Sequence, residues 1–219
     1  MATSNTAVFI LISAWVAFFF SHSLLANQTV KHYILSTLPG LTPCYRMGYN
    51  IVAIIMLIPI IVIHALNQSQ PVFQWPSLFS ELNIIMMTLA TLGFIWSLKY
   101  YDLQAFTGIR SCLNKNAPTP QEKLTISPLH RFVRHPWYLF ALVIIWSREQ
   151  NQLELISSTL MTVYFFVGAR LEEKKLIREY GESYQQYINC VPGIIPRPWK
   201  FLSIDEALNI EQRALRHHD

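Results

Sequence analysis

Two charged clusters flank the last apolar segments of the chain. One is the run Arg131-Phe-Val-Arg134-His135-Pro136-Trp137-Tyr138, and the other is Arg170-Leu-Glu172-Glu173-Lys-Lys. Arg and His side chains can donate charge-assisted hydrogen bonds to a carboxylate, whereas paired glutamates can accept them from an ammonium group. The two clusters therefore predict opposite walls of one pocket for a zwitterionic ligand.

S-adenosylmethionine is a ligand of this kind. Its carboxylate would bind the basic wall, and the acidic wall and tyrosine faces would stabilise its ammonium and sulfonium charges. The seven glycines of the chain include no GxG pair, so neither a Rossmann turn nor a phosphate-binding P-loop is indicated. A nucleotide-like cofactor must therefore be held in another way.

Each part of this pattern also has a simpler explanation. Arg131 and Arg134 could anchor helix ends among lipid phosphates. The Glu172–Glu173 pair could be the solvated face of a helix, and Tyr184 and Tyr187 could belong to an aromatic belt at the membrane surface. Only the combination favours a pocket.

The elements that must position these residues are apolar. The chain is 52% hydrophobic and only 14% charged, whereas a soluble domain carries about 25% charged residues. Apolar runs cover Ala7–Leu25, Gly48–Leu66 and Leu82–Trp96, and helices of this order of length can cross a hydrocarbon core of about 30 Å. The fold class predicted is an all-α integral membrane bundle of about five transmembrane helices.

The last two apolar runs, Trp137–Ser147 and Leu153–Gly168, predict a helical hairpin because few polar residues separate them. The first is too short to span the membrane alone. Ser127 is a good N-cap and Pro128 a good first residue, which would extend this helix backwards with a kink at Pro136. Charged residues on those early turns would face protein or water, and would line a polar cavity.

The remaining segments are simpler. The stretch 114–121 contains two prolines and predicts a flexible loop, and Ser203-x-x-Glu206 is a capping-box pattern that predicts a short terminal helix.

The three cysteines, Cys44, Cys112 and Cys190, are far apart and form no CxxC pair, which predicts neither a disulfide nor a zinc site. We expect one membrane domain over 1–219, with amino-terminal spans and loop (1–126), the hairpin and cofactor region (127–200) and a tail (201–219).

The motif residues, taken together, resemble the isoprenylcysteine carboxyl methyltransferase superfamily. The matching elements are Arg134-His135-Pro136-Trp137-Tyr138, then Glu172-Glu173, then Tyr180-Gly181-x-x-Tyr184-x-x-Tyr187, and finally Val191-Pro192, in the same order and spacing. This superfamily also includes phospholipid methyltransferases, NnrU-type membrane proteins and methanethiol S-methyltransferases. The amino-terminal half is similar to the NnrU and methanethiol branch at His22-Ser-Leu-Leu, Tyr45-Arg46-x-x-Tyr49-Asn50 and Tyr101-Asp102 through Gly108-Ile-Arg110.

The resemblance implies an S-adenosylmethionine-dependent methyltransferase acting on a small or lipophilic nucleophile such as a thiol, with no metal. Phe140 stands where the family often has glycine, and is expected to narrow the space near the cofactor. Arg170 and Glu173 are expected near the transfer site. The residues expected to bind the cofactor are Arg134, His135, Pro136, Tyr138, Glu172, Tyr184, Val191 and Pro192.

Other functions stay open at this stage. An isoprenylcysteine carboxyl or phospholipid methyltransferase would share the motifs. Sterol reductases share related architecture but use NADPH, and a non-enzymatic NnrU-like protein could retain a vestigial pocket. The expected partners are the lipid bilayer and the methyl acceptor, with no nucleic acid.

The basic residues predict the orientation in the membrane. Every Lys and Arg except Arg148 lies between the first and second spans, between the third and fourth, or after the fifth. Cytoplasmic loops are enriched in these residues, so the amino terminus is expected outside and the carboxyl terminus in the cytoplasm of a bacterial inner membrane. This distribution accounts for the net charge of +4 without a nucleic acid partner.

Single cysteines introduced into a variant without native cysteines test this orientation. An impermeant thiol reagent applied from outside should label a cysteine near Gln68 or Gln150, and should miss one at Asn114 or in the tail. Labelling of position 114 in intact cells would reverse the assignment of sides.

Overall fold

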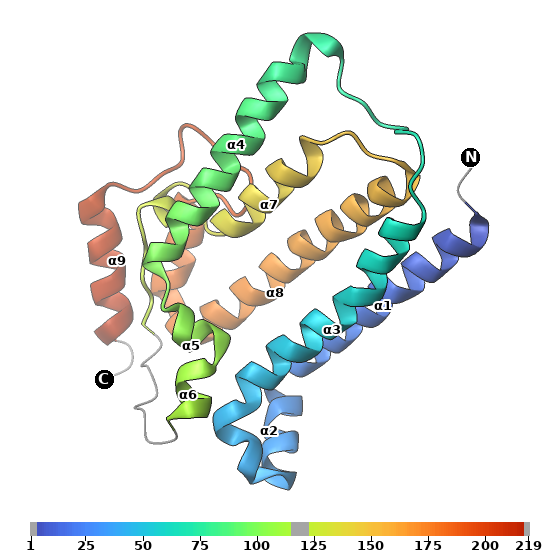
Figure 1. Ribbon diagram of the computed structural model, residues 1–219. Coiled ribbons are helices and arrows are strands. Elements are labelled where there is room, and N and C mark those ends of the chain that lie inside the picture. The colour runs from blue at the N-terminus through green and yellow to red at the C-terminus, as the bar shows by residue number, and fades with distance from the viewer. Residues whose placement is uncertain (1–3, 115–122, 217–219) are drawn as a thin grey trace. The chain divides into compact units, whose positions relative to one another are not determined.

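The computed structural model describes residues 4–114 and 123–216 (Figure 1). The loop that the sequence predicts over 114–121 lies, apart from Asn114, outside these residues. Within the two described ranges the chain is helical, and its β-type pairing is limited to isolated bridges such as that between Phe73 and Gln150. The predicted all-α fold is confirmed.

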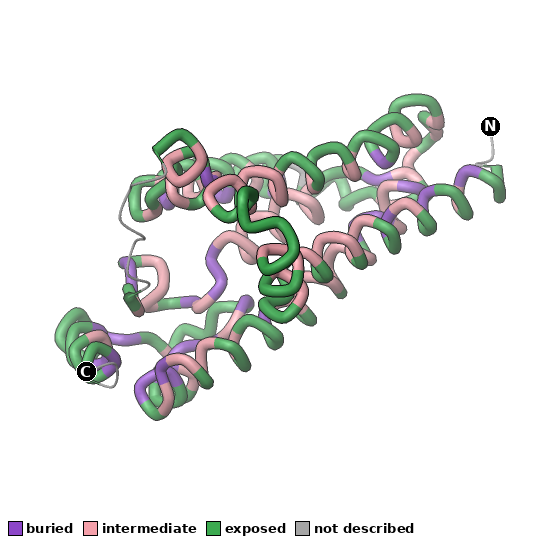
Figure 2. The backbone as a smooth tube through the Cα atoms, turned by 90° about the horizontal axis from the view of Figure 1, so that it is seen from below, coloured by how far each residue is buried: buried purple, intermediate pink, exposed green. Residues whose placement is uncertain are grey.

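Four helical stretches of the described chain are long and apolar enough to cross a membrane. They are α1 (Asn5–Ala26), η1 with α3 (Pro39–Leu66), η2 through η3 with α4 (Ser77–Tyr100), and α8 (Gln152–Cys190). A shorter apolar helix, α7 (Pro136–Trp146), matches the predicted short segment. Many apolar residues of the four long stretches are exposed (Figure 2), which suits surfaces in contact with lipid. These helices indicate an integral membrane protein.

The chain forms two compact units, and the first contains residues 1–75, 101–120 and 149–160. Here α1 packs on α3. The indole of Trp15 donates to Ser157 Oγ (2.7 Å), and His64 Nε2 lies 2.9 Å from the same hydroxyl. Ser157 in the first turns of α8 therefore joins α1 to α3.

The amino-terminal motif residues also meet within this unit. Tyr49 Oη lies 2.6 Å from His22 Nε2, and Asn50 Nδ2 donates to the carbonyl of Thr107 (3.1 Å) at the end of α5 (Leu103–Thr107). Arg110 in α6 (Ile109–Leu113) pairs with Asp102, the N-cap of α5. These residues therefore hold the short helices against α3.

Cys44 and Cys112 form a disulfide in this unit, so the prediction of no disulfide was wrong. The two cysteines are separated by 68 residues in the sequence. They meet because η1 (Pro39–Cys44), which follows α2 (Gln28–Thr37), packs against α6. Cysteine spacing cannot reveal such a tertiary contact, and Cys190 is a free thiol.

The second unit contains residues 76–100, 121–148 and 161–219. Its helices α4 (Ser80–Ser97) and α7 pack together. The Trp137 indole donates to Ser97 Oγ (2.8 Å). The Phe140 ring packs against the backbone at Gly93, and a Cβ added to Gly93 would lie 2.8 Å from Phe140 Cζ. Phe140 therefore serves the packing of α7 on α4.

Helix α7 begins at Pro136, so the prediction that it starts at Pro128, capped by Ser127, was wrong. Residues Leu129–Arg131 form one 3₁₀ turn, and His135 (φ −124°, ψ 68°) is not helical. Proline disfavours helical backbone at the preceding residue, and its missing N–H is tolerated at the first helical position. Arg134 and His135 therefore lie in a turn before the helix, and Pro136 starts α7 without kinking it.

Helix α8 changes direction at Gly181, whose φ of 57° lies in the left-handed region. With a ψ of −132°, a residue with a Cβ would be strained there, by roughly 1–3 kcal/mol. The turn carries Tyr184, Tyr187 and Val191 into the core of the second unit. This accounts for the glycine of the Tyr180-Gly181 motif.

The last helix, α9 (Ile204–Arg216), packs on that core through Ala207, Ile210 and Ala214. Ser203 Oγ accepts from the amide of Glu206 (3.2 Å), and the Glu206 carboxylate accepts from the amide of Ser203 (2.7 Å). The predicted capping box is confirmed.

The contact between Gly93 and Phe140 predicts the effect of G93A. The added methyl group would overpack the interface of α4 and α7, and should lower the free energy of unfolding by about 1–3 kcal/mol. Thermal unfolding in detergent measures this loss, and F140L should restore part of it in the double variant. G48A is the control, because no heavy atom lies within 4 Å of its added Cβ. Equal stability of G93A and the wild type would contradict the packing.

Candidate functional site

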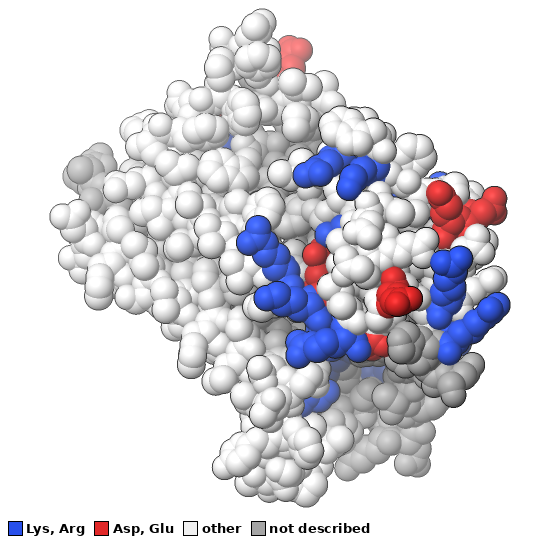
Figure 3. All heavy atoms as spheres, turned by 180° about the vertical axis from the view of Figure 1, so that it is seen from behind, with Lys and Arg blue, Asp and Glu red and all other residues white. Residues whose placement is uncertain are grey.

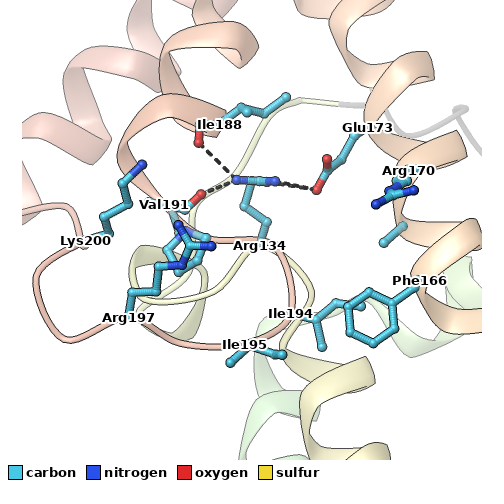
Figure 4. A pocket seen from close by; sticks show the side chains of 13 residues that line it. Arg134, Phe166, Arg170, Glu173, Ile188, Val191, Ile194, Ile195, Arg197 and Lys200 are labelled. Atoms are coloured by element: carbon cyan, nitrogen blue, oxygen red, sulfur yellow. Dashed lines mark hydrogen bonds and ion pairs between the residues drawn. The ribbon is translucent and has the colours of Figure 1, made fainter. Parts of the chain in front are cut away.

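A cavity of about 340 Å³ lies in the second unit between α8, Arg134 and the segment 188–200, which we call the hook (Figure 4). Its volume is in the range of small-molecule sites. The wall combines apolar with cationic side chains. Its lining residues are Arg134, Phe166, Ala169, Arg170, Glu173, Ile188, Val191, Pro192, Gly193, Ile194, Ile195, Arg197 and Lys200.

A nearly buried ion pair joins Arg134 to Glu173. Arg134 Nη2 and Nε lie 2.7 Å and 2.9 Å from Glu173 Oε1, and the two side chains are only 9% and 15% exposed. The third guanidinium nitrogen, Nη1, donates to the carbonyls of Ile188 (3.1 Å) and Val191. A buried charge needs such partners, and here they fix the start of the hook to α8.

His135 lies between the two glutamates. Its Nε2 is 2.9 Å from Glu173 Oε1, and its Nδ1 is 3.6 Å from Glu172 Oε2. The His135 ring stacks on Tyr138, which stacks on Phe165, with centroid distances of 5.4 Å and 4.9 Å. Glu172, with a side chain 50% exposed, is free to bind a ligand on its outer side.

Backbone hydrogen bonds attach the hook to the turn before α7. The amides of Arg134 and His135 donate to the carbonyls of Pro192 (2.9 Å) and Gly193 (3.0 Å). A Cβ on Gly193 would lie 3.4 Å from Arg134 Nη2, so the hook packs closely on the ion pair. The same motif residues thus form part of the cavity wall and hold it in place.

The predicted site residues fall into three groups. Arg134, Arg170, Glu173, Val191 and Pro192 line the cavity. Four lie outside the lining, in the turn before α7, in the first turn of α7 and on α8, and they are His135, Pro136, Tyr138 and Glu172. Tyr184, at 2% exposed, lies in the core beside Tyr187.

Phe140 is not among the lining residues, because its ring packs on Gly93. The expectation that Phe140 narrows the cofactor space is therefore not supported for this cavity.

Sequence reasoning missed Arg197 and Lys200, which it counted only for membrane orientation. Lys200 Nζ donates to the carbonyl of Asn189 (3.1 Å), whereas the side chains of Arg170 and Arg197 make no hydrogen bond or ion pair with any described residue. Lys and Arg side chains gather around visible carboxylates on the face drawn in Figure 3. The signal that could have identified them was the presence of basic residues on the proline-rich hook, shortly after Val191-Pro192.

His130 has a structural role. Burial lowers the pKa of His130 to about 4, and the nearby His135 adds to the effect. Its Nδ1 lies 2.7 Å from Ser127 Oγ, and its carbonyl accepts from Tyr187 Oη (2.6 Å). His130 is therefore neutral near pH 7 and joins the turn to α8.

Removal of one partner from the ion pair predicts a large loss of stability. E173A leaves the Arg134 guanidinium buried without its carboxylate, and should lower the free energy of unfolding by about 3 kcal/mol. K174A, which removes an exposed charge from the next position of α8, should change it by less than about 0.5 kcal/mol. Thermal unfolding in detergent compares the two, and equal unfolding temperatures would show that the pair does not stabilise the fold.

The chain is similar to several proteins named methanethiol S-methyltransferase. Methanethiol S-methyltransferase 1 of Bradyrhizobium diazoefficiens is 27% identical over 198 residues, which cover 87% of this chain and 67% of the relative. Methanethiol S-methyltransferases of Crocosphaera subtropica and Pseudomonas deceptionensis are 24% and 26% identical, over 87% and 80% of this chain and 75% and 67% of theirs. No solved structure matches the chain significantly.

These relatives confirm the expected similarity to the methanethiol branch of the membrane methyltransferases. The family DUF1295, described as a protein of unknown function, matches residues 44–191. That range includes the turn before α7, the paired glutamates of α8 and the first residue of the Val191-Pro192 motif. This chain belongs to the DUF1295 family.

Proposed function

We propose that this protein is a membrane methyltransferase that uses S-adenosylmethionine and a small thiol acceptor. The observation that carries the proposal is the cluster of Arg134, His135, Glu172 and Glu173 beside the hook cavity. This cluster unites two motifs that lie more than thirty residues apart in the sequence. The proposed orientation puts the cavity on the cytoplasmic side of a bacterial inner membrane, where S-adenosylmethionine is available.

The chemistry of the side chains fits this cofactor. Arg197 and Lys200 offer cations for its carboxylate, and Glu172 offers a half-exposed carboxylate for its ammonium group. The ring of Phe166 on the cavity wall offers a face that stabilises a sulfonium charge. When bound, the cofactor supplies an electrophilic methyl group.

The protein's main contribution would be positioning. The Arg134–Glu173 pair and the backbone bonds to Pro192 and Gly193 hold the hook at a fixed distance from α8. Holding two reactants in line for displacement removes much of the entropic barrier. Arg134 and Glu173 would therefore act as positioning residues, and Tyr184 would support them from the core.

A small thiol acceptor is favoured by the relatives, all three of which are named methanethiol S-methyltransferases. A lipid-tailed acceptor, such as an isoprenylcysteine or a phospholipid, is the second candidate. It is favoured by the exposed Phe166 and Ile195 on the cavity wall, which would let a hydrocarbon chain enter from the bilayer.

Calorimetry on the purified protein tests the cofactor. S-adenosylmethionine should bind, and E172Q and H135A should each weaken binding by about 1.5–3 kcal/mol, the usual worth of a hydrogen bond to a charged group. R213A in α9 is the control, since among the described residues the Arg213 side chain bonds only Gln186 on the surface, and it should bind as the wild type does. Unchanged affinity in both site variants would mean that these residues do not hold the cofactor.

Binding measurements on the same purified protein also distinguish the alternative functions. Binding of NADPH in place of S-adenosylmethionine would favour a reductase, and binding of neither would favour a non-enzymatic protein. Methyl transfer to methanethiol, N-acetyl-farnesylcysteine and phosphatidylethanolamine should be fastest with methanethiol. Activity confined to either lipid-tailed acceptor would replace the thiol with the second candidate.

A further inference from the structure

We propose that Arg170 binds the methyl acceptor as an anion, so that a thiol reacts as its thiolate above an apolar wall of the cavity. This inference rests on the proposed function and names the residue that selects and activates the acceptor. It follows from three features of the cavity, which are its charge, its lack of a suitable base and the position of Arg170.

The cavity carries uncompensated positive charge. Its charged lining residues are Arg134, Arg170, Glu173, Arg197 and Lys200. Arg134 and Glu173 neutralise each other as an ion pair, which leaves three cations. S-adenosylmethionine, with two positive groups and one carboxylate, adds another net positive charge. An anionic acceptor would reduce the repulsion among these groups, whereas an amine acceptor would not.

The described lining offers no base suited to a thiol. Its one carboxylate, Glu173, already accepts from Arg134 and His135 at Oε1. Even an unperturbed glutamate has a pKa of about 4.3, roughly four units below that of a cysteine thiol. The thiol proton must therefore pass to water before transfer, and a nearby cation must stabilise the thiolate.

Arg170 is placed for this role. It lies one helical turn after Phe166 and just under one turn before Glu173 on α8, so the three side chains share a helix face. Figure 4 shows Arg170 and Phe166 on the same side of the cavity, with Ile194 near Phe166. The Arg170 guanidinium has no hydrogen bond or ion pair with a described residue, and beside apolar side chains its charge is screened less than in water.

The other cations have different roles. Arg134 is saturated by Glu173 and the hook carbonyls. Arg197 and Lys200 are on the hook, where the proposed function assigns them to the cofactor carboxylate. Arg170 comes from the opposite wall, α8, and is left for the acceptor.

The reaction then balances without another reagent. The thiolate sulfur forms a bond to the methyl carbon while the bond from that carbon to the sulfonium sulfur breaks. The electron pair of the broken bond stays on the departing sulfur, which becomes a neutral thioether. Charge is neutralised during transfer, so the role of Arg170 is to raise the amount of bound thiolate.

This arrangement gives a net gain in rate. Each unit by which a cation lowers the thiol pKa yields about tenfold more thiolate at neutral pH, whereas nucleophilicity falls only about threefold when the Brønsted slope is about 0.4–0.5. The net gain is roughly threefold per unit. Because Arg170 is exposed, a shift of about one unit is expected, smaller than a buried guanidinium would cause.

The test is the pH profile of kcat, which reports ionisation in the bound complex, for a short alkyl thiol with both substrates saturating, with wild type, R170Q, R170K and the control K174Q. The kcat of R170Q should be about threefold below that of wild type at pH 7 and approach it at pH 10, with the midpoint of the profile raised by about one unit. R170K should keep most of the wild-type profile, because it retains the charge. S-adenosylmethionine should bind R170Q as tightly as wild type, and K174Q should match wild type throughout.

The outcomes separate this inference from the proposed function. If wild type transfers no methyl group to any thiol, the proposed function is overturned. If wild type is active but R170Q is slowed equally at every pH, or R170K behaves as R170Q does, the role of Arg170 is overturned alone. Should R170Q fail to fold, wild type is assayed with two thiols that ionise about two pH units apart. If the midpoint of the pH profile does not shift with the pKa of the thiol, the inference is overturned.

Discussion

The ion pair between Arg134 and Glu173 is the constraint on which the cavity depends. Its members come from the turn before α7 and from the middle of α8, and both are nearly buried. Breaking a buried pair leaves a charge without compensation, which is strongly unfavourable. The remaining donors of Arg134 bind carbonyls of the hook, so one guanidinium sets the relative positions of turn, helix and hook.

This arrangement gives the motif residues two roles that sequence similarity cannot separate. Arg134, Tyr184 and Val191 are occupied by the fold itself, through an ion pair or burial in the core. Glu172, Arg170 and Arg197 keep groups that a ligand can reach. The first set holds the cavity wall together, and under the proposed function the second set would supply the chemistry. The excess of cations over carboxylates on the lining then favours ligands with negative charge.

Both the membrane character and several local structures follow from short-range patterns. Apolar runs near twenty residues long need only their own backbone hydrogen bonds to form helices in lipid, so the spans could be predicted without tertiary information. The capping box at Ser203 and Glu206 closes within three residues. The order and spacing of the motifs were enough to predict that His135, Glu172 and Glu173 lie close together, as the structure shows.

The sequence by itself thus determined the helical membrane fold, the family resemblance and the acidic-basic cluster. The start of α7 follows a local rule that the prediction missed, because proline disfavours helix at His135. Only the tertiary structure decided the pairing of Cys44 with Cys112 across 68 residues. It also turned Phe140 toward Gly93 and brought Arg197 and Lys200 to the cavity. Each of these depends on which surfaces meet after the helices pack, and helical periodicity or motif spacing carries no information about that.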